Sequence, residues 1–318
     1  MSLRIAFQMD PIDKINIAED TTFRIAEEAQ KRGHELFYFL PQDLTYIENQ
    51  LVARARTLKV RRSVGNHFTL GPTEKLSLVN DVDIIWLRQD PPFDMSYITT
   101  THLLDFLVGK TLVVNNPFWV RNFPEKILVL NYPDLTPPTM VGCDVGMFKA
   151  FRKMHGDTIV KPLYGNGGAG IFKIGKDDPN LSSLIELFHN ISREPIIMQK
   201  FLPDVKLGDK RVILVDGLPV GAINRVPIQG EIRSNMHVGG KALQVDLTSR
   251  DLEICKTVGP LMKEKGQILV GLDIIGDMLT EINLTSPTGI QELERFNNIN
   301  VAKKVWECLE ERHNLGLK

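Results

Sequence analysis

Short apolar runs alternate with amphipathic stretches in the first third of the chain. The apolar runs predict strands at 3–9, 35–40, 83–87 and 111–114, and the amphipathic stretches predict helices at 23–31 and 97–108. Asp20 to Thr22 can cap the first helix and Gly33 can close it. Strands alternating with helices indicate a parallel sheet with crossover connections, whose ligands usually bind at the carboxyl ends of the strands. Asp10-Pro11 and the segment from Arg88 to Pro92 occupy such ends.

The pattern changes near residue 122. A helix is predicted at 121–132, and prolines at 133, 137 and 138 mark a linker. After it come a strand at 139–141, a helix at 145–154, a strand at 157–162, a glycine run, a strand at 171–174 and an apolar strand at 195–202. We therefore divide the chain into an N-terminal α/β domain (1–122), a central domain (123–201) and a C-terminal domain (202–318).

The last third contains strands at 212–215 and 218–225, joined by a turn at Asp216-Gly217. A polar, glycine-containing segment follows at 229–241 and has the length of an active-site lid. A helix at 249–265 then presents one apolar face, so it is a packing element.

A hairpin at 272–288 carries the first candidate site. Gly276-Asp277 interrupts two β segments, and alternation puts Glu281 and Asn283 on the same side. A three-residue loop would place Asp273 opposite Glu281, whereas a two-residue loop would place it opposite Thr280. In the first case two carboxylates and an amide oxygen converge, which suits Mg²⁺. The alternative is an edge hairpin with a solvated polar face.

The glycine run from Gly165 to Gly170 fits G-x-G-x-x-G, yet a β-branched and aromatic segment follows it instead of a helix. A dinucleotide fingerprint requires that helix, and no Gly-Lys-Ser/Thr closes a P-loop. The remaining interpretations are a mobile surface hairpin and a loop that closes over phosphates, as kinase glycine loops do. Lys161, just before the loop, favours phosphate. The apolar strand at 195–202 can be a buried central strand, the edge of an adenine pocket, or both.

Arginines supply the third candidate feature. Arg211, Arg225 and Arg233 lie in one short span and suit anionic oxygen, although solvated strand ends would look the same. Arg88 follows a strand beside Pro91-Pro92, and we treat it as a substrate contact, with a surface residue or a helix-dipole partner as the alternative.

Composition excludes several classes of function. The formal net charge of −1 gives no basic surplus for nucleic acid or an anionic membrane, and the apolar runs are too short for a membrane span. The first residues read as a strand and not as a signal peptide. Three widely spaced cysteines predict reduced thiols in a cytoplasmic protein, with neither disulfides nor zinc.

The order of motifs is specific. It runs through MDPIDKINIAEDTTF, LRQDPPFD, Glu125-Lys126, the lysine strand with its glycine loop, MQKFLP, GDKRV and LDIIGDMLTEINLTSPT. This arrangement resembles the ATP-grasp superfamily and, within it, the bacterial glutathione synthetases, along essentially the whole chain. The fold implied is α/β: an ATP-grasp fold behind an N-terminal open parallel sheet. One departure is the segment from Gly239 to Gln244, where a more arginine-rich run is expected.

The resemblance also implies roles for individual residues. Contacts to ATP would come from the phosphate-binding lysines, the loop glycines, the adenine border and a ribose neighbour: Lys126, Lys161, Gly167, Gly168, Gln199, Lys200, Leu202 and Asp209. Mg²⁺, or Mn²⁺ in its place, would be held by Asp273, Glu281 and Asn283. The phosphorylated carboxylate and the peptide would be received by Arg211, Arg225, Arg233, Asn235, Ser286 and Thr288.

The implied reaction joins γ-glutamylcysteine and glycine at the expense of ATP, through an acyl phosphate, to give glutathione. It needs positioning and charge neutralisation and no protein nucleophile. The resemblance further implies a homo-oligomer, a tetramer, and selects the register with Asp273 opposite Glu281, hence a loop with an odd number of residues. The rivals are a different ATP-grasp ligase and a non-catalytic nucleotide-binding protein on the same scaffold.

Overall fold

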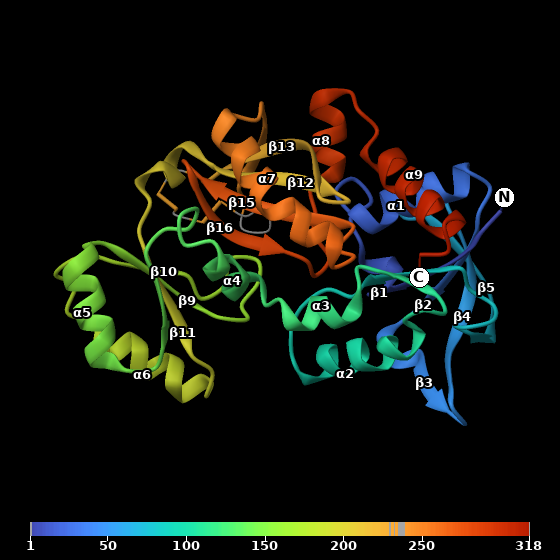
Figure 1. Ribbon diagram of the computed structural model, residues 1–318, viewed down its shortest axis with the longest axis horizontal. Helices are drawn as coiled ribbons and strands as arrows, with labels where there is room; N and C mark the ends of the chain where they lie inside the picture. The colour runs from blue at the N-terminus through green and yellow to red at the C-terminus, as the bar shows by residue number, and fades with distance from the viewer. Residues whose placement is uncertain (1, 229, 232, 235–238, 318) are drawn as a thin grey trace.

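The computed structural model describes residues 2–317 apart from residues 229, 232 and 235–238, and its strands form three sheets (Figure 1). The first sheet has the strand order β3-β4-β2-β1-β6-β7, with β5 paired to β4. Its strands are β1 (Arg4–Met9), β2 (Glu35–Phe39), β3 (Leu44–Ile47), β4 (Gln50–Val60), β5 (Phe68–Ser77), β6 (Ile84–Arg88) and β7 (Leu112–Val114). Only the pairs β2-β1, β1-β6 and β6-β7 are parallel. The predicted open parallel sheet is therefore extended by an antiparallel part at 44–77 that the sequence reading did not include.

Helices α1 (Thr21–Lys31) and α2 (Met95–Leu104) provide the crossovers of this sheet. The Asp20 side chain accepts a hydrogen bond from Phe23 N, which confirms the predicted cap. The helix predicted at 121–132 is wrong, because the chain forms α3 (Pro117–Asn122), α4 (Glu125–Leu128) and a short 3-10 turn (Val129–Asn131). Pro124 lies between the two helices, and a proline lacks the N–H that a continuous helix needs.

The second sheet has the order β10-β9-β11-β8. It consists of β8 (Thr139–Gly142), β9 (Thr158–Pro162), β10 (Phe172–Ile174) and β11 (Ile196–Lys200), with α5 (Val145–His155) and α6 (Leu181–Ile191) packed against it. Its hydrophobic cluster draws buried residues only from 148–198. Figure 1 shows this lobe, in green, set apart from the rest of the molecule.

The third sheet has the order β14-β13-β12-β15-β16 and is antiparallel throughout. Its strands are β12 (Asp209–Val215), β13 (Leu218–Val226), β14 (Lys241–Val245), β15 (Leu269–Ile275) and β16 (Met278–Asn283). Helix α7 (Ser249–Glu264) covers one face and buries Ile254, Val258 and Met262 against it, as predicted for a packing element. A short 3-10 segment (Pro203–Leu207) connects the second sheet to the third.

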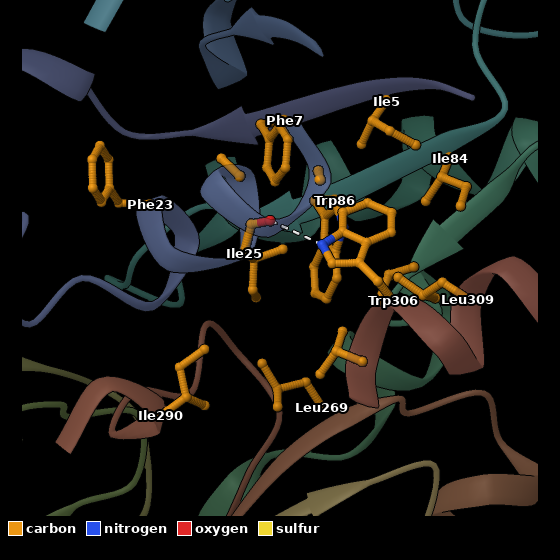
Figure 2. Close-up of a cluster of buried hydrophobic side chains, with 14 of the residues drawn as sticks. Ile5, Phe7, Phe23, Ile25, Ile84, Trp86, Leu269, Ile290, Trp306 and Leu309 are labelled. Carbon is orange, nitrogen blue, oxygen red and sulfur yellow. Dashed lines mark hydrogen bonds between the residues drawn. The ribbon is translucent and has the colours of Figure 1, made fainter. Parts of the chain in front are cut away.

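The last two helices, α8 (Ile290–Asn297) and α9 (Val301–Asn314), return to the N-terminal sheet, where α9 lies beside α1 (Figure 1). Trp306 of α9 is fully buried, packs edge-on against Trp86 of β6 and donates its indole N–H to Ile25 O at 2.9 Å (Figure 2). One hydrophobic cluster therefore joins the two ends of the chain. The predicted boundaries at 122 and 201 stay a prediction about independently folding units.

Candidate active site

The hairpin β15-β16 places Asp273 directly opposite Glu281, as predicted. The loop prediction was wrong, however, because Ile275 pairs with Met278 and leaves a two-residue turn, Gly276-Asp277. The register shifts by one residue after Asp273, so Thr280 is an extra residue in β16. The Thr280 hydroxyl donates to Asp273 O at 3.1 Å. A bulge, and not an odd-numbered loop, thus brings Asp273 opposite Glu281.

Asp273 is buried among arginines. Arg211, on the neighbouring strand, donates Nε and Nη2 to its two carboxylate oxygens at 2.5 and 3.0 Å, and Arg225 Nη2 lies 3.0 Å from Oδ1. Burial alone would raise the pKa of Asp273, but the two guanidinium charges outweigh it and hold this pKa well below its usual range. Asp273 is therefore a fixed anion at any physiological pH.

Asp209 shares Arg225 with Asp273. Its Oδ2 accepts from Arg225 Nη2 at 2.6 Å and from the Ser234 hydroxyl at 3.0 Å. Among the residues that the structure describes, the buried Oδ1 of Asp209 has no hydrogen-bond partner. Burial, together with the charge of Asp273, raises the pKa of Asp209 to about 6 against the opposing charge of Arg225. An unmatched acceptor of this kind suits a ligand hydroxyl.

Two buried lysines lie close to these carboxylates. Lys126 Nζ lies 2.9 Å from Glu281 Oε1 and also contacts the carbonyl of Gly165, so it links α4, β16 and the glycine loop. Lys161 at the end of β9 is buried, and its Nζ donates to Gln199 Oε1 at 3.3 Å. In the described part of the chain Lys161 has no carboxylate within salt-bridge distance. Burial lowers the pKa of Lys161, and the charge of Lys126 adds to this shift, while the charges of Glu281, Asp209 and Asp273 offset it only in part.

The glycine loop connects β9 to β10, which confirms the strand–loop–strand context. Gly167 and Gly168 have φ values of 61° and 81°, in the left-handed region where glycine is favoured. Tyr164 at the start of the loop stacks on Phe93 of the N-terminal sheet domain, with ring centroids 5.9 Å apart and planes 24° apart. Phe93, Tyr164 and Lys126 line a small cavity between the N-terminal sheet and the glycine loop.

The remaining predicted site residues fall into three places. Gln199 is buried at the end of β11, where Lys200 is exposed and Leu202 half-buried. Arg233 is half-exposed and pairs with Glu231 at 2.9 Å, so the structure does not bring it to Arg211 and Arg225. Asn235 lies outside the described residues.

Ser286 and Thr288 follow the hairpin in a segment that Arg88 supports. Arg88 is buried, with Nε on the Thr22 hydroxyl at 2.9 Å and Nη2 on Pro287 O at 3.2 Å. Ser286 has a φ of 52°, an unusual value for a residue with a side chain, and its hydroxyl donates to Arg88 O at 3.4 Å. In this structure, then, Arg88 shapes the segment that carries the predicted substrate contacts.

The predicted metal set fits a hard divalent cation by the chemistry of its donors. Asp273 and Glu281 face each other, Asn283 lies two residues further along the same strand, and all three supply oxygen. The described residues contain no cluster of three or more His, Cys, Asp or Glu side chains that could hold a metal, so the site depends on the amide oxygen of Asn283 and on ligand oxygens.

Two residues that contact the hairpin were not assigned a role from the sequence. Asn115 follows β7 directly, and Glu125 begins α4; both side chains bond the backbone beyond β16. The only sequence signal for Asn115 was its place at the carboxyl end of a strand, and Glu125 was noted only as part of a motif.

Comparison with known proteins explains this geometry. Residues 3–121 match the family model for the N-terminal domain of prokaryotic glutathione synthetase, and residues 125–298 match the model for its ATP-grasp domain. The chain belongs to the prokaryotic glutathione synthetase family. Glutathione synthetase of Brucella melitensis biotype 1 is 54% identical over 312 residues, which cover 98% of this chain and 100% of that protein. The Yersinia pestis glutathione synthetase is 44% identical over 313 residues and 98% of each chain.

Solved structures support the fold at lower identity. The D-cycloserine synthetase DcsG has a TM-score of 0.65 at 15% identity, over 96% of this chain and 99% of that one. The ATP-grasp ligase PsnB, complexed with a precursor variant, Mg and ADP, has a TM-score of 0.64 at 18% identity, over 98% and 99% of the two chains.

Fold, family, enzyme class and function are thus as predicted: this is an ATP-grasp ligase of glutathione biosynthesis, with ATP as substrate and a divalent metal as cofactor. No helix within the described ranges is long and apolar enough to cross a membrane.

Proposed function

We propose that the chain joins γ-glutamylcysteine to glycine through an acyl phosphate, and that the buried Lys161 marks the phosphate site. Its side chain has one weak contact, to Gln199 Oε1, and no carboxylate partner among the described residues. A buried cation without an anion is destabilising, so the position favours an anionic ligand. Phosphate oxygens of ATP would supply the missing charge.

Around Lys161 the other nucleotide contacts follow. Lys126 would give a second charge to the phosphates, and the left-handed Gly167 and Gly168 would let backbone N–H groups approach them. Gln199, Lys200 and Leu202, at the end of β11, would border the adenine. The Oδ1 of Asp209, which has no hydrogen-bond partner among the described residues, would accept from a ribose hydroxyl.

Asp273, Glu281 and Asn283 would hold Mg²⁺, with Mn²⁺ as the alternative. When bound, the ion neutralises phosphate charge and shields the transferring group from repulsion by the attacking carboxylate. Lys126 keeps Glu281 in place at 2.9 Å, and Arg211 does the same for Asp273. These cations thereby fix the ligand oxygens before the substrates arrive.

The arginines would also act on the substrate. Arg211 and Arg225 stand beside Asp273, where the phosphorylated carboxylate has to lie if it faces the metal. Their charges would stabilise the negative charge that develops as the acyl phosphate forms, and again as the glycine amine displaces the phosphate. Ser286, Thr288, Asn235 and the half-exposed Arg233 would complete peptide binding.

The test is a phosphate-release assay in which ATP, γ-glutamylcysteine and glycine are omitted in turn. Full release should require all three. Lys161→Ala and Glu281→Gln should each lose at least roughly tenfold in activity, about 1.4 kcal/mol of transition-state stabilisation. Lys153→Ala, an exposed lysine of the same lobe, serves as the matched control and should keep normal activity.

Other outcomes select the rivals. Release with different acids or amines, but not with this pair, would indicate another ATP-grasp ligase. ATP binding without turnover would indicate a nucleotide-binding protein. We further propose a cytoplasmic homotetramer of three-domain subunits with the boundaries given above, whose mass light scattering would measure.

A further inference from the structure

The segment from Leu284 to Thr288 is held by side chains that belong to neither hairpin strand. Glu125 Oε1 accepts three hydrogen bonds, from Leu284 N at 2.7 Å, Thr285 N at 2.9 Å and the Thr285 hydroxyl at 2.7 Å. A single carboxylate oxygen thus satisfies every donor that these two residues present. Its partners lie about half the chain away, 159 and 160 residues along the sequence.

Asn115 holds the same segment through a different backbone group, the carbonyl of Leu284. Its Nδ2 donates to Leu269 O at 2.8 Å and to Leu284 O at 3.1 Å, while its Oδ1 accepts from Leu269 N at 3.0 Å. The amide therefore bridges the first residue of β15 and the residue after β16, and it ties both to the end of β7. Asn115 is buried, so these bonds form away from water.

The backbone is strained at Ser286, between the contacts of Glu125 and Asn115 and the contact of Arg88. Ser286, one residue beyond the Glu125 contacts, adopts the left-handed φ of 52°. Such a conformation costs about 1–3 kcal/mol for a residue with a side chain and persists only where the surroundings enforce it. Here the enforcing bonds are those of Glu125 and Asn115 on one side and of Arg88, to Pro287 O, on the other.

We infer that Asn115 and Glu125 are positioning residues for the peptide substrate: they hold Leu284 and Thr285 so that Ser286 and Thr288 face the site. Neither side chain is free to touch substrate through the atoms that make these bonds. This inference rests on the proposed role of Ser286 and Thr288. Without either of these side chains, Ser286 would relax toward negative φ, and the hydroxyls of Ser286 and Thr288 would move away from the peptide.

Glu125 also lies close to Glu281, so its negative charge, and not only its acceptor oxygen, could act on the site. Burial and the nearby charge of Glu281 raise its pKa, while its bonds to Thr285 oppose the shift. A positioning role requires only an acceptor oxygen at Oε1. Glu125→Gln keeps that oxygen and removes the charge, so this variant separates the two roles.

The experiment measures kcat and KM for γ-glutamylcysteine, binding of ADP and the melting temperature. Glu125→Ala and Asn115→Ala should each lower kcat/KM for the dipeptide roughly tenfold, mainly through KM, with ADP affinity changed less than about twofold. Glu125→Gln should stay within about threefold of the parent enzyme. Thr285→Val removes only the hydroxyl donor and gives a milder variant, with a loss of about threefold, in case an alanine variant fails to fold.

Gln267→Ala is the matched control. Gln267 is fully buried at the same junction and donates to Asn116 O at 3.2 Å and Lys265 O at 3.1 Å, and it has no hydrogen bond to the described residues 284–288. It should lower the melting temperature and leave the dipeptide KM unchanged. An equal rise of KM in Gln267→Ala, a loss in Glu125→Gln as large as in Glu125→Ala, or an unchanged dipeptide KM in both alanine variants would overturn the inference.

These outcomes are separate from failure of the proposed function. If the parent enzyme makes no glutathione, the function is wrong. If it does, but Ser286→Ala and Thr288→Ala keep the normal dipeptide KM, the assignment of those hydroxyls is wrong and the inference fails with it. If those two variants lose affinity while Asn115→Ala and Glu125→Ala do not, only the positioning inference fails.

Discussion

Replacing Arg211 with lysine tests how far the site depends on a fixed Asp273. Arg211 donates to both carboxylate oxygens, at 2.5 Å and 3.0 Å. A lysine keeps the charge but has a single ammonium group, so it cannot reproduce this two-point contact. Arg211→Lys therefore changes geometry while the net charge of the site stays the same.

The magnitude follows from the bond that is lost. One hydrogen bond to a charged group contributes about 1.5–3 kcal/mol. Arg225 Nη2 still lies 3.0 Å from Oδ1 and restrains the carboxylate in part. We therefore expect the lower end of that range, about 1.5–2 kcal/mol, which corresponds to a loss of roughly 10- to 30-fold in kcat/KM.

The assay is phosphate release at varied metal and dipeptide concentrations, with ADP binding measured in parallel. The metal concentration for half-maximal activity should rise, because a mobile Asp273 is a poorer ligand. Arg24→Lys is the control: Arg24, on α1, pairs with Glu294 of α8 at 2.7 Å and with Glu28 at 3.3 Å, outside the site. It should lower the melting temperature and keep normal kinetics. The reasoning is refuted if Arg211→Lys behaves like Arg24→Lys, with lower stability and kcat/KM within about twofold of the parent.

Three further predictions concern the supporting structure. His34 Nδ1 accepts from Leu3 N at 3.2 Å, and burial lowers the pKa of His34 below the ordinary 6.5. The unfolded chain therefore binds more protons below pH 6.5, so the free energy of unfolding falls as the pH drops, by at most about 1.4 kcal/mol per pH unit. In urea unfolding, His34→Gln should lose this pH dependence, and an unchanged pH slope would contradict the prediction. Trp306→Ala should lower the free energy of unfolding by about 3–5 kcal/mol in the same assay, whereas a loss under about 1 kcal/mol would mean that α9 is not part of the N-terminal core. Phe93→Ala should raise the KM for ATP roughly 2- to 10-fold, because it removes the stacking on Tyr164, which contributes about 0.5–1.5 kcal/mol. Tyr164→Phe keeps the ring and should keep the parent KM. Equal KM values in the parent and both variants would mean that this contact plays no part in closure of the glycine loop.

The local sequence pattern was sufficient to predict the secondary structure of the elements that carry the site. Alternation placed Glu281 and Asn283 on one face of β16, and the β-branched segment after the glycine loop excluded a helix there. In both cases the deciding signal lies within a few residues of the feature. The Asp20 cap and the packing face of α7 are of the same kind.

The hairpin loop shows where local pattern ends. A three-residue loop and a two-residue turn with one bulged residue give the same pairing of Asp273 with Glu281, so the register alone cannot distinguish them. Nothing marks Thr280 as the bulge, since threonine is an ordinary strand residue. The bulge is visible only in the ladder and in the Thr280 hydroxyl bond to Asp273 O.

Contacts between distant parts of the chain could not be predicted at all. Asn115 and Glu125 are separated from their partners by 154 to 169 residues, and no spacing rule connects them. The antiparallel strands at 44–77 were missed for a different reason: they add to the edge of a sheet whose parallel part already formed a complete pattern.

The cores also suggest which part of the molecule moves when the site closes. The cluster that contains Trp306 joins residues from both ends of the chain, so the first and third sheets act as one support for the hairpin (Figure 2). The second sheet has its own core, drawn from 148–198, and reaches the site through Lys161, the glycine loop and the Phe93–Tyr164 stack. Because a separate core preserves its shape as a unit, closure over ATP should carry Lys161 and the glycine loop together, while Asp273 and Glu281 stay in place on the rigid support.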